Sequence, residues 1–224
     1  MTIQARPKKA AAAASRPRRR AAKGSYHHGD LRRALVEQAL RLAAEGGIEA
    51  VNIREAARRA GVSPGAPFRH FADRQTLITA VAEEAQRRFR GEVERAVAAA
   101  PQGDPLARFR AIGTAYLRWA LGNPMHFEVI STGRVFDHDQ AGALSQDNSE
   151  IIAMVDRVLA DAAAQGQLRG VDVEQVRIAG RALVYGFARM AVDGHFPRWG
   201  IAAREIEATG EAMLDFFIAR IRSD

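Results

Sequence analysis

The stretch Asn52–Phe71, NIREAARRAGVSPGAPFRHF, decides how the rest of the chain is interpreted. Asn52 can cap a helix N-terminus, and Glu55 three residues later can bond back to it, as in a capping box. The helix predicted over Ile53–Ala60 ends at Gly61, a residue type that accepts the left-handed conformation of a tight turn. The first half of the stretch is therefore predicted to be a short helix closed by a sharp turn.

The second half of the stretch reopens a helix. Val62 supplies an apolar contact, Ser63 a capping hydroxyl, and Pro64 suits the first helical position. Small residues on the first helix would let the second helix cross it closely: Ala56, Ala57 and Ala60. Two short helices joined by a turn containing Gly form the helix-turn-helix unit of proteins that bind the major groove. The sequence thus predicts a helix-turn-helix.

Length and composition limit the class of protein. The chain has 224 residues, enough for one large or two small domains with a hydrophobic core. It contains no cysteine, which excludes disulfides, thiol catalysis and cysteine metal sites. No apolar run is long enough to cross a bilayer, and the basic N-terminus lacks the apolar segment of a secretory signal. We therefore expect a cytoplasmic protein with no membrane partner.

The formal net charge of +7 is concentrated near the N-terminus. Residues 1–29 carry eight Lys and Arg and no acid, which leaves 25 Lys and Arg against 26 Asp and Glu in the remainder. We expect residues 1–24 to form a disordered basic arm, because this segment has no apolar periodicity. Such an arm can bind nucleic-acid phosphates; a solubilising extension is the alternative. His27 and His28 follow the arm without nearby partners, so no metal site is predicted.

Further helices are expected on both sides of the helix-turn-helix. Before it, the segment Asp30–Ala44 has apolar residues on one helical face and ends at Gly46-Gly47; that face contains Leu31, Leu35, Ala39 and Leu42. After it, Asp73 caps a longer helix that continues to Pro101. The N-terminal part is thus predicted to hold three short helices connected to the rest of the chain by a long one.

The segment Tyr26–Ala82 closely resembles the DNA-binding domain of TetR-type transcriptional regulators. The matching features are the run GIEAVNIREAA, the following AGVS, an aromatic residue three positions before Phe71, and the acidic–basic pair Asp73-Arg74 that opens a long helix. The resemblance implies a homodimer whose recognition helices enter successive major grooves and whose DNA binding is controlled by a small molecule. It implies a DNA-binding domain over residues 25–85 and an effector-binding and dimerisation domain over residues 86–224.

The same resemblance implies which residues contact DNA: Asn52, Arg54, Ser63, Pro64, Gly65, Ala66, Phe68, Arg69, His70 and Arg74. Phe68 stands where the family usually has a tyrosine, so the phosphate bond of the hydroxyl is lost. Pro67 removes one backbone hydrogen bond, which predicts a short or slightly kinked recognition helix. Arg74 replaces the usual lysine and is expected to keep a phosphate contact.

A competing motif lies in the same stretch. Residues 61–65, GVSPG, fit the G-x-S-x-G nucleophile elbow of hydrolases. That elbow follows a β-strand, whereas the preceding residues favour a helix. It also needs the backbone N–H after the serine, and Pro64 has none. We therefore predict no catalytic residue, no metal, no cofactor and no enzyme activity.

The remainder of the chain is predicted to be all-α, because no segment alternates with a strand period. Helices are expected from Asp104-Pro105 to Gly122, from Asn123-Pro124, over Asp147–Gln165, from Asp172 to about Asp193, and over roughly Ala202–Ile221. Residues 131–146 are polar and contain two glycines, and we interpret them as a loop or frayed helix.

The last two predicted helices carry apolar stripes with small residues. In the family, the last two helices commonly pack against the same helices of a second protomer and form the dimer interface. The alternative is that these apolar residues pack in the core of one chain. The residues predicted for the dimer interface are Val176, Gly180, Leu183, Phe187, Met190, Ile206, Gly210, Met213 and Phe217.

Large residues spread over the helices that usually enclose an effector suggest a pocket for an apolar or amphipathic small molecule. The residues predicted to line it are Phe89, Tyr116, Trp119, Met125, His126, Phe127, Met154 and Phe187. Core packing is the alternative for each of them.

Together these features favour a ligand-responsive regulator, in particular a repressor of a palindromic double-stranded DNA operator. The alternative is an architectural protein that binds DNA through the basic arm with little sequence preference.

Overall fold

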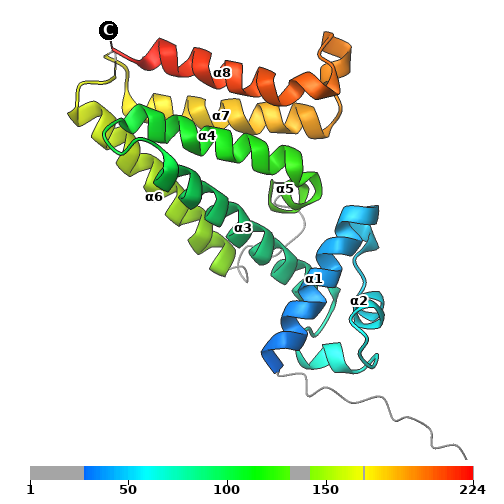
Figure 1. Ribbon diagram of the computed structural model, residues 1–224. Helices are drawn as coiled ribbons and strands as arrows, with labels where there is room; N and C mark the ends of the chain where they lie inside the picture. Colours follow the sequence, from blue (N-terminus) through cyan, green and yellow to red (C-terminus); the bar gives the residue numbers. More distant parts are fainter. Residues whose placement is uncertain (1–27, 132–141, 169, 224) are drawn as a thin grey trace, which may run out of the picture.

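The computed structural model describes residues 28–131, 142–168 and 170–223, and this part of the chain is all-α as predicted. Its one β pairing is an isolated bridge between Leu168 and Arg222. The predicted basic arm and His27 lie outside the described residues. Figure 1 shows a small N-terminal head joined by a long helix to a larger helical body.

The head and the body contain the following helices. The head consists of α1 (His28–Gly46), η1 (Ile48–Ala50), α2 (Ile53–Arg59) and η2 (Ala66–Arg69), where η marks a 3-10 helix. The connecting helix is α3 (Arg74–Ala99). The body adds α4 (Pro105–Gly122), α5 (Pro124–Ser131), α6 (Gly142–Ala164), α7 (Val173–Val192), η3 (Phe196–Trp199), η4 (Ala203–Glu205) and α8 (Ile206–Ile221).

Predicted acidic N-caps set the start of three long helices. The Asp73 carboxylate accepts hydrogen bonds from the backbone N–H and the hydroxyl of Thr76, at 2.8 and 2.9 Å. Asp104 caps α4 and Asp172 caps α7, each by accepting from the backbone N–H three residues later. These bonds satisfy N–H groups that have no partner inside the helix, which is why the sequence located these starts correctly.

The structure refines two predicted boundaries. The polar segment before residue 147 is helical from Gly142, since side chains bond back along the first turns: the Ser149 hydroxyl donates to the Ser145 carbonyl at 2.9 Å. Arg90 of α3 also pairs with Asp147 at 2.8 Å and holds this end of α6 against α3. The last α-helix begins at Ile206, and residues 203–205 before it form η4.

Helix α4 is the centre of the body and contacts α3, α5, α6, α7 and α8. Glycines allow this close packing. A Cβ atom on Gly180 of α7 would lie 2.9 Å from the Phe109 ring of α4, and one on Gly210 of α8 would lie 3.0 Å from Leu117 of α4. The small residues of α7 and α8 therefore let these helices pack closely against α4 of the same chain. Packing within one chain was the alternative to a dimer contact in the sequence analysis.

The head and the body have separate hydrophobic cores that meet at α5. Phe127 is buried in the body core, whereas Val129 is buried in the head core with Leu35, Phe71 and Leu77. Two residues apart on a helix, these side chains point to nearly opposite sides. Figure 1 shows α5 between the body helices and one end of α1. The short helix α5 thus belongs to both cores.

Candidate nucleic-acid interface and ligand cavity

The turn between α2 and η2 has the geometry expected from its sequence. The Asn52 side chain accepts from the backbone N–H groups of Arg54 and Glu55, at 2.8 and 3.3 Å. Gly61 has φ +70°, and the Val62 N–H donates to the Ala57 carbonyl at 3.1 Å, which closes α2 with a Schellman motif. A residue with a Cβ would be strained at Gly61.

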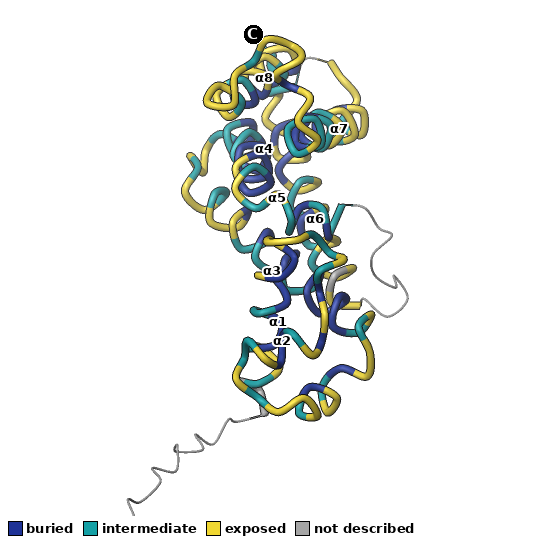
Figure 2. The backbone as a smooth tube through the Cα atoms, turned by 90° about the vertical axis from the view of Figure 1, so that its right-hand side faces the viewer, coloured by how far each residue is buried: buried dark blue, intermediate teal, exposed yellow. Residues whose placement is uncertain are grey.

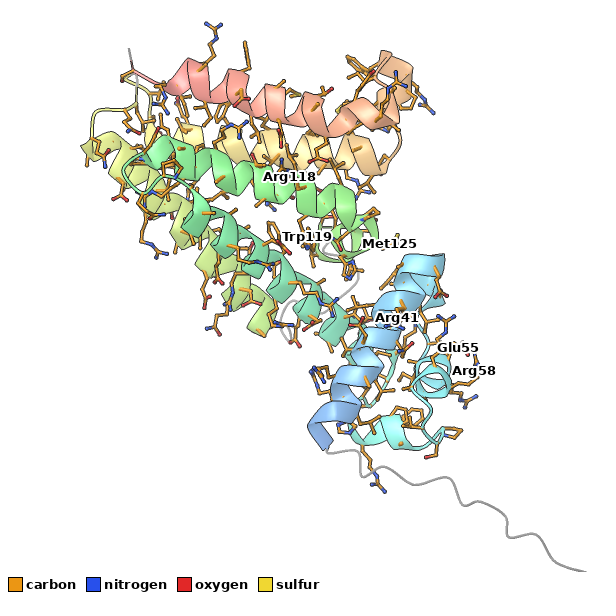
Figure 3. The ribbon with its side chains drawn as sticks, viewed as in Figure 1. Arg41, Glu55, Arg58, Arg118, Trp119 and Met125 are labelled. Carbon is orange, nitrogen blue, oxygen red and sulfur yellow. The ribbon has the colours of Figure 1, made fainter. Side chains whose placement is uncertain are left out.

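The predicted return bond of Glu55 is absent, because arginines one turn later take its carboxylate. Arg58 donates to both carboxylate oxygens at 2.8 and 2.7 Å, and Arg59 donates at 2.9 Å. Figure 3 shows Glu55 and Arg58 together on α2. Hydrogen bonds from Arg58 first and Arg59 second lower the pKa of Glu55 to about 2. These two arginines are therefore neutralised within the head.

The recognition segment is short, as Pro67 predicted, but it begins later than the expected start at Ser63-Pro64. It is the 3-10 helix η2, which begins at Ala66 after Gly65 and has no side-chain cap, so the predicted capping role of Ser63 was wrong. Pro67 lies within its first two positions, where no intrahelical N–H is needed, and its ring is buried beside Phe71. Burial of these rings anchors the segment and leaves its other side exposed.

The exposed side of this segment contains predicted DNA-contacting residues from the turn and from η2. Exposed positions include Ser63, Pro64, Gly65, Phe68 and Arg69, together with Asn52 and Arg54 at the start of α2. Within the described part of the chain, neither Arg54 nor Arg69 has an acidic partner. The start of α2 and η2 therefore each present one unneutralised cation, Arg54 and Arg69, and η2 adds an aromatic ring; this combination suits phosphates and base edges.

Arg74 and His70 are partly buried at the base of this surface. The Arg74 guanidinium donates to the carbonyls of Val51 and Ile48 at 2.8 and 2.7 Å, and it contacts Glu49 at 3.2 Å. These bonds fix the first turn of α3 to the connection between α1 and α2. The sequence predicted that Asp73-Arg74 joins the head to the long helix and that Arg74 binds phosphate; the bonds to Val51 and Ile48 supply the first role, and the DNA contact stays a prediction.

The body contains a cavity of about 590 Å³, within the size range of small-molecule sites. Residues from α3, α4, α6, α7 and α8 line it. Apolar side chains cover most of the wall, including Phe89, Ile112, Ile151, Val155 and Leu214. The polar residues of the wall are Arg110, Tyr116, Asn148, Arg177, Arg181 and Tyr185. An apolar cavity with a few grouped polar side chains suits an amphipathic ligand.

Two tyrosines and one arginine of this wall contact one another. The Arg181 guanidinium carbon lies 5.0 Å from the centre of the Tyr116 ring and 5.8 Å from that of Tyr185. Burial raises the pKa of Tyr116 to about 12, so its hydroxyl stays protonated at physiological pH and is available as a donor.

The outer faces of α7 and α8 carry apolar side chains that the chain itself leaves exposed. Ile178 on α7 is 58% exposed and Phe216 on α8 is 64% exposed; Ile178 also lines the cavity, so this face of α7 forms part of the cavity wall as well. Small residues on the same faces are also exposed, among them Ala182 on α7 and Ala212 on α8. Figure 2 shows these helices at one end of the molecule, with much of α8 exposed.

Comparison with known proteins connects the head and the body to one family. A family model described as "Bacterial regulatory proteins, tetR family" matches residues 35–81. A second family model, described as "Tetracyclin repressor-like, C-terminal domain", matches residues 109–217. The chain belongs to the TetR family. TetR-family proteins are transcriptional regulators with a helix-turn-helix DNA-binding domain, so the resemblance inferred from the sequence is confirmed.

Individual relatives agree with this assignment. The HTH-type transcriptional repressor KstR of Mycolicibacterium smegmatis is 27% identical over 139 residues, which span 62% of this chain and 67% of that protein. The HTH-type transcriptional regulator AcrR of Shigella flexneri is 34% identical over 83 residues, 37% of this chain and 38% of the relative. A solved structure of a Rhodococcus protein of unknown function has a TM-score of 0.75 and 29% identity, covering 90% of this chain and all of the other.

In this TetR-family chain, two of the eight residues predicted for the effector pocket, Phe89 and Tyr116, line the cavity. The other six lie outside its wall: Trp119, Met125, His126, Phe127, Met154 and Phe187. Trp119 packs behind Phe89 at 4.8 Å between ring centres, and Phe187 pairs with Phe196 at 4.6 Å. Met125 faces the head, near Gly47 (Figure 3). Most of these large residues are therefore core, which the sequence analysis left open as the alternative.

Apart from Tyr116, the polar wall residues were missed because the prediction relied mainly on aromatic and apolar size. Arg177, Arg181 and Tyr185 are spaced four residues apart on α7, so they share one helical face. A polar stripe on a helix otherwise rich in Val, Ala and Gly is the signal that identifies this side of the cavity.

The predicted dimer residues lie mainly inside the chain. Val176, Gly180, Phe187 and Gly210 are buried within the protomer, and Met213 is the exposed member of the set. The predicted stripes thus face α4, and different residues of α7 and α8 face outward. The dimer contact of the predicted set stays untested.

The described residues show neither a metal site nor a membrane-spanning helix. No group of three or more His, Cys, Asp or Glu side chains comes together there as a metal site would require. None of the described helices combines the length and the apolarity needed to cross a membrane.

Proposed function

We propose that this TetR-family regulator is a homodimeric repressor that leaves its operator when a small molecule enters the body cavity. The observation that carries the proposal is the position of α5. This short helix touches residues of the cavity wall on one side and contributes to the head core on the other, so it can transmit a change between the two sites.

The first link of this path joins the cavity to α5. The Phe127 ring lies 6.1 Å from Tyr116 and 6.0 Å from Tyr185, measured between ring centres, and both tyrosines line the cavity. Arg189 of α7 adds a second tie, because its guanidinium pairs with Glu128 at 2.5 Å and lies over the Phe127 ring. A ligand that displaces the tyrosine rings would therefore displace α5.

The second link joins α5 to the head. Val129 is 1% exposed within the head core, and Ile130 packs against both cores. Close-packed cores respond to such displacements by moving as units. Two heads joined through the body would then change their spacing or tilt, and binding to two half-sites about one helical turn apart would weaken.

For DNA binding we infer that Arg54 and Arg69 supply phosphate contacts and that Phe68 and the backbone of residues 63–66 approach base edges. Arg58 and Arg59 are already paired with acids in the head, so we assign them no role in DNA binding. For dimerisation we infer that the outer faces of α7 and α8, marked by Ile178 and Phe216, meet their copies.

Footprinting tests this proposal. The purified full chain is incubated with the DNA upstream of its own gene at moderate and at low salt, and protection of an inverted repeat is expected. Arg69→Gln should weaken protection, whereas Arg95→Gln, an exposed arginine of α3, should not. Absence of any protected site at low salt would contradict the proposal. Loss of operator preference after removal of residues 1–24 would favour binding through the arm.

A further inference from the structure

We infer that the cavity of the body selects amphipathic carboxylates, with Arg181 as the residue that recognises the anionic group. This inference deepens the proposed function, since it names the class of molecule that the cavity would bind. It rests on the distribution of charge around the wall.

The charges of the cavity wall are unbalanced. Three arginines line it, and none of the described residues of its wall is Asp or Glu. Arg110 is neutralised by Asp215, which accepts two hydrogen bonds from it at 2.5 and 3.0 Å. Arg177 has two acidic partners at 3.4 Å, Asp156 and Glu174. For Arg181, no acidic partner exists among the residues that the structure describes, so the wall has one uncompensated positive charge.

Aromatic side chains hold this charge at the cavity. The Arg181 guanidinium lies over the rings of Tyr116 and Tyr185, an arrangement that fixes its position without using an acid. Arg181 is also exposed, so water solvates it while the cavity has no ligand. A carboxylate can replace that water and accept two parallel N–H bonds, the geometry that a guanidinium prefers.

The remainder of the wall selects the other end of the ligand. Ile112 of α4, Ile151 and Val155 of α6 and Phe89 of α3 form an apolar surface with no charged group among them. A small inorganic anion would make no contact with this apolar surface. A cation with an apolar chain would be repelled by the positive charge of Arg181. An apolar body carrying one carboxylate satisfies both parts of the wall.

Calorimetry with probes of equal chain length tests the inference without DNA. Decanoate, 1-decanol and decyltrimethylammonium share the alkyl chain and differ in head-group charge, and acetate supplies the carboxylate alone. We expect decanoate to bind the full chain at least about tenfold more tightly than the other three, which is the lower range for a hydrogen bond to a charged group. Equal binding of the alcohol or the ammonium would overturn the inference, and so would no binding of decanoate.

Matched variants assign the effect to Arg181. Arg181→Gln should remove about tenfold or more of the decanoate affinity and leave 1-decanol unchanged, whereas Arg181→Lys should keep part of the preference because it keeps the charge. Arg95→Gln, the same change on the outside of α3, should have no effect. Unchanged decanoate binding by Arg181→Gln would assign recognition elsewhere and overturn the inference. Footprinting is measured separately, so failure of ligand selection and failure of operator binding can be told apart.

Discussion

At the scale of single residues, the turn of the helix-turn-helix depends on one backbone conformation. Gly61 has φ +70° and open space around its missing Cβ, whereas Gly65 also has open space but has φ −87°. Gly61→Ala should therefore lower the free energy of unfolding by about 1–2 kcal/mol through backbone strain alone. Gly65→Ala should be neutral or slightly stabilising, because it restricts only the unfolded chain. Urea unfolding measures both, and equal effects would contradict the role of the left-handed turn.

Two arginines of the head should separate stability from DNA binding. Arg74 bonds two backbone carbonyls, so Arg74→Gln should lower the free energy of unfolding by about 1.5 kcal/mol. Arg69 is exposed and has no acidic partner in the described head, so Arg69→Gln should leave stability unchanged. It should also weaken DNA binding and make it less dependent on salt. Urea unfolding and salt-dependent titration of DNA distinguish the two residues; a stability loss in Arg69→Gln would refute this division.

At the scale of secondary-structure elements, α2 contains a pH-dependent contribution from Glu55. Its pKa falls from 4.5 to about 2 because Arg58 and Arg59 bond the ionised carboxylate. The lowered folded-state pKa means that Glu55 stabilises the fold fully above pH 4.5 and that this contribution is lost as the pH falls toward 2. The stability difference between the natural chain and Glu55→Gln should shrink over that window. A difference that stays constant with pH would show that the ion pairs contribute nothing.

Most elements were predictable because their signals are local. Asp73, Asp104 and Asp172 cap helices through bonds that span three residues, and the sequence alone specifies such bonds. The start of α6 and the 3-10 form of η2 were not predictable in this way. The first turns of α6 are polar and are held to α3 by the pairing of Arg90 with Asp147, which are more than fifty residues apart, and η2 depends on the burial of Pro67 and Phe71. The cavity wall was the least predictable part, since an aromatic residue has the same spacing in a core as in a pocket.

At the scale of the whole molecule, the outer faces of α7 and α8 predict the oligomeric state. Phe216→Glu places a charge on an exposed apolar face and should convert a dimer to a monomer in sedimentation equilibrium. Phe68→Glu is the control, because Phe68 is 51% exposed but lies in the head. It should leave the mass unchanged. A dimer that persists in Phe216→Glu would place the interface on another surface.

The link through α5 makes a prediction that spans both cores. Val129 and Val158 are equally apolar and almost equally buried, one in the head core and one in the body core. Truncation of either to Ala removes two methyl groups and should cost about 2 kcal/mol of stability. Val129 lies in α5, which follows α4 of the body along the chain, but its side chain is buried in the head core. Val129→Ala should therefore raise the hydrogen-exchange rate of the α1 amides around Leu35 and Val36. Val158→Ala should leave those amides protected, because local openings follow the core to which a side chain belongs. If both variants raised the exchange rate of the α1 amides equally, the two cores would unfold as one unit. In that case α5 would join the two cores but could not move the head independently of the body.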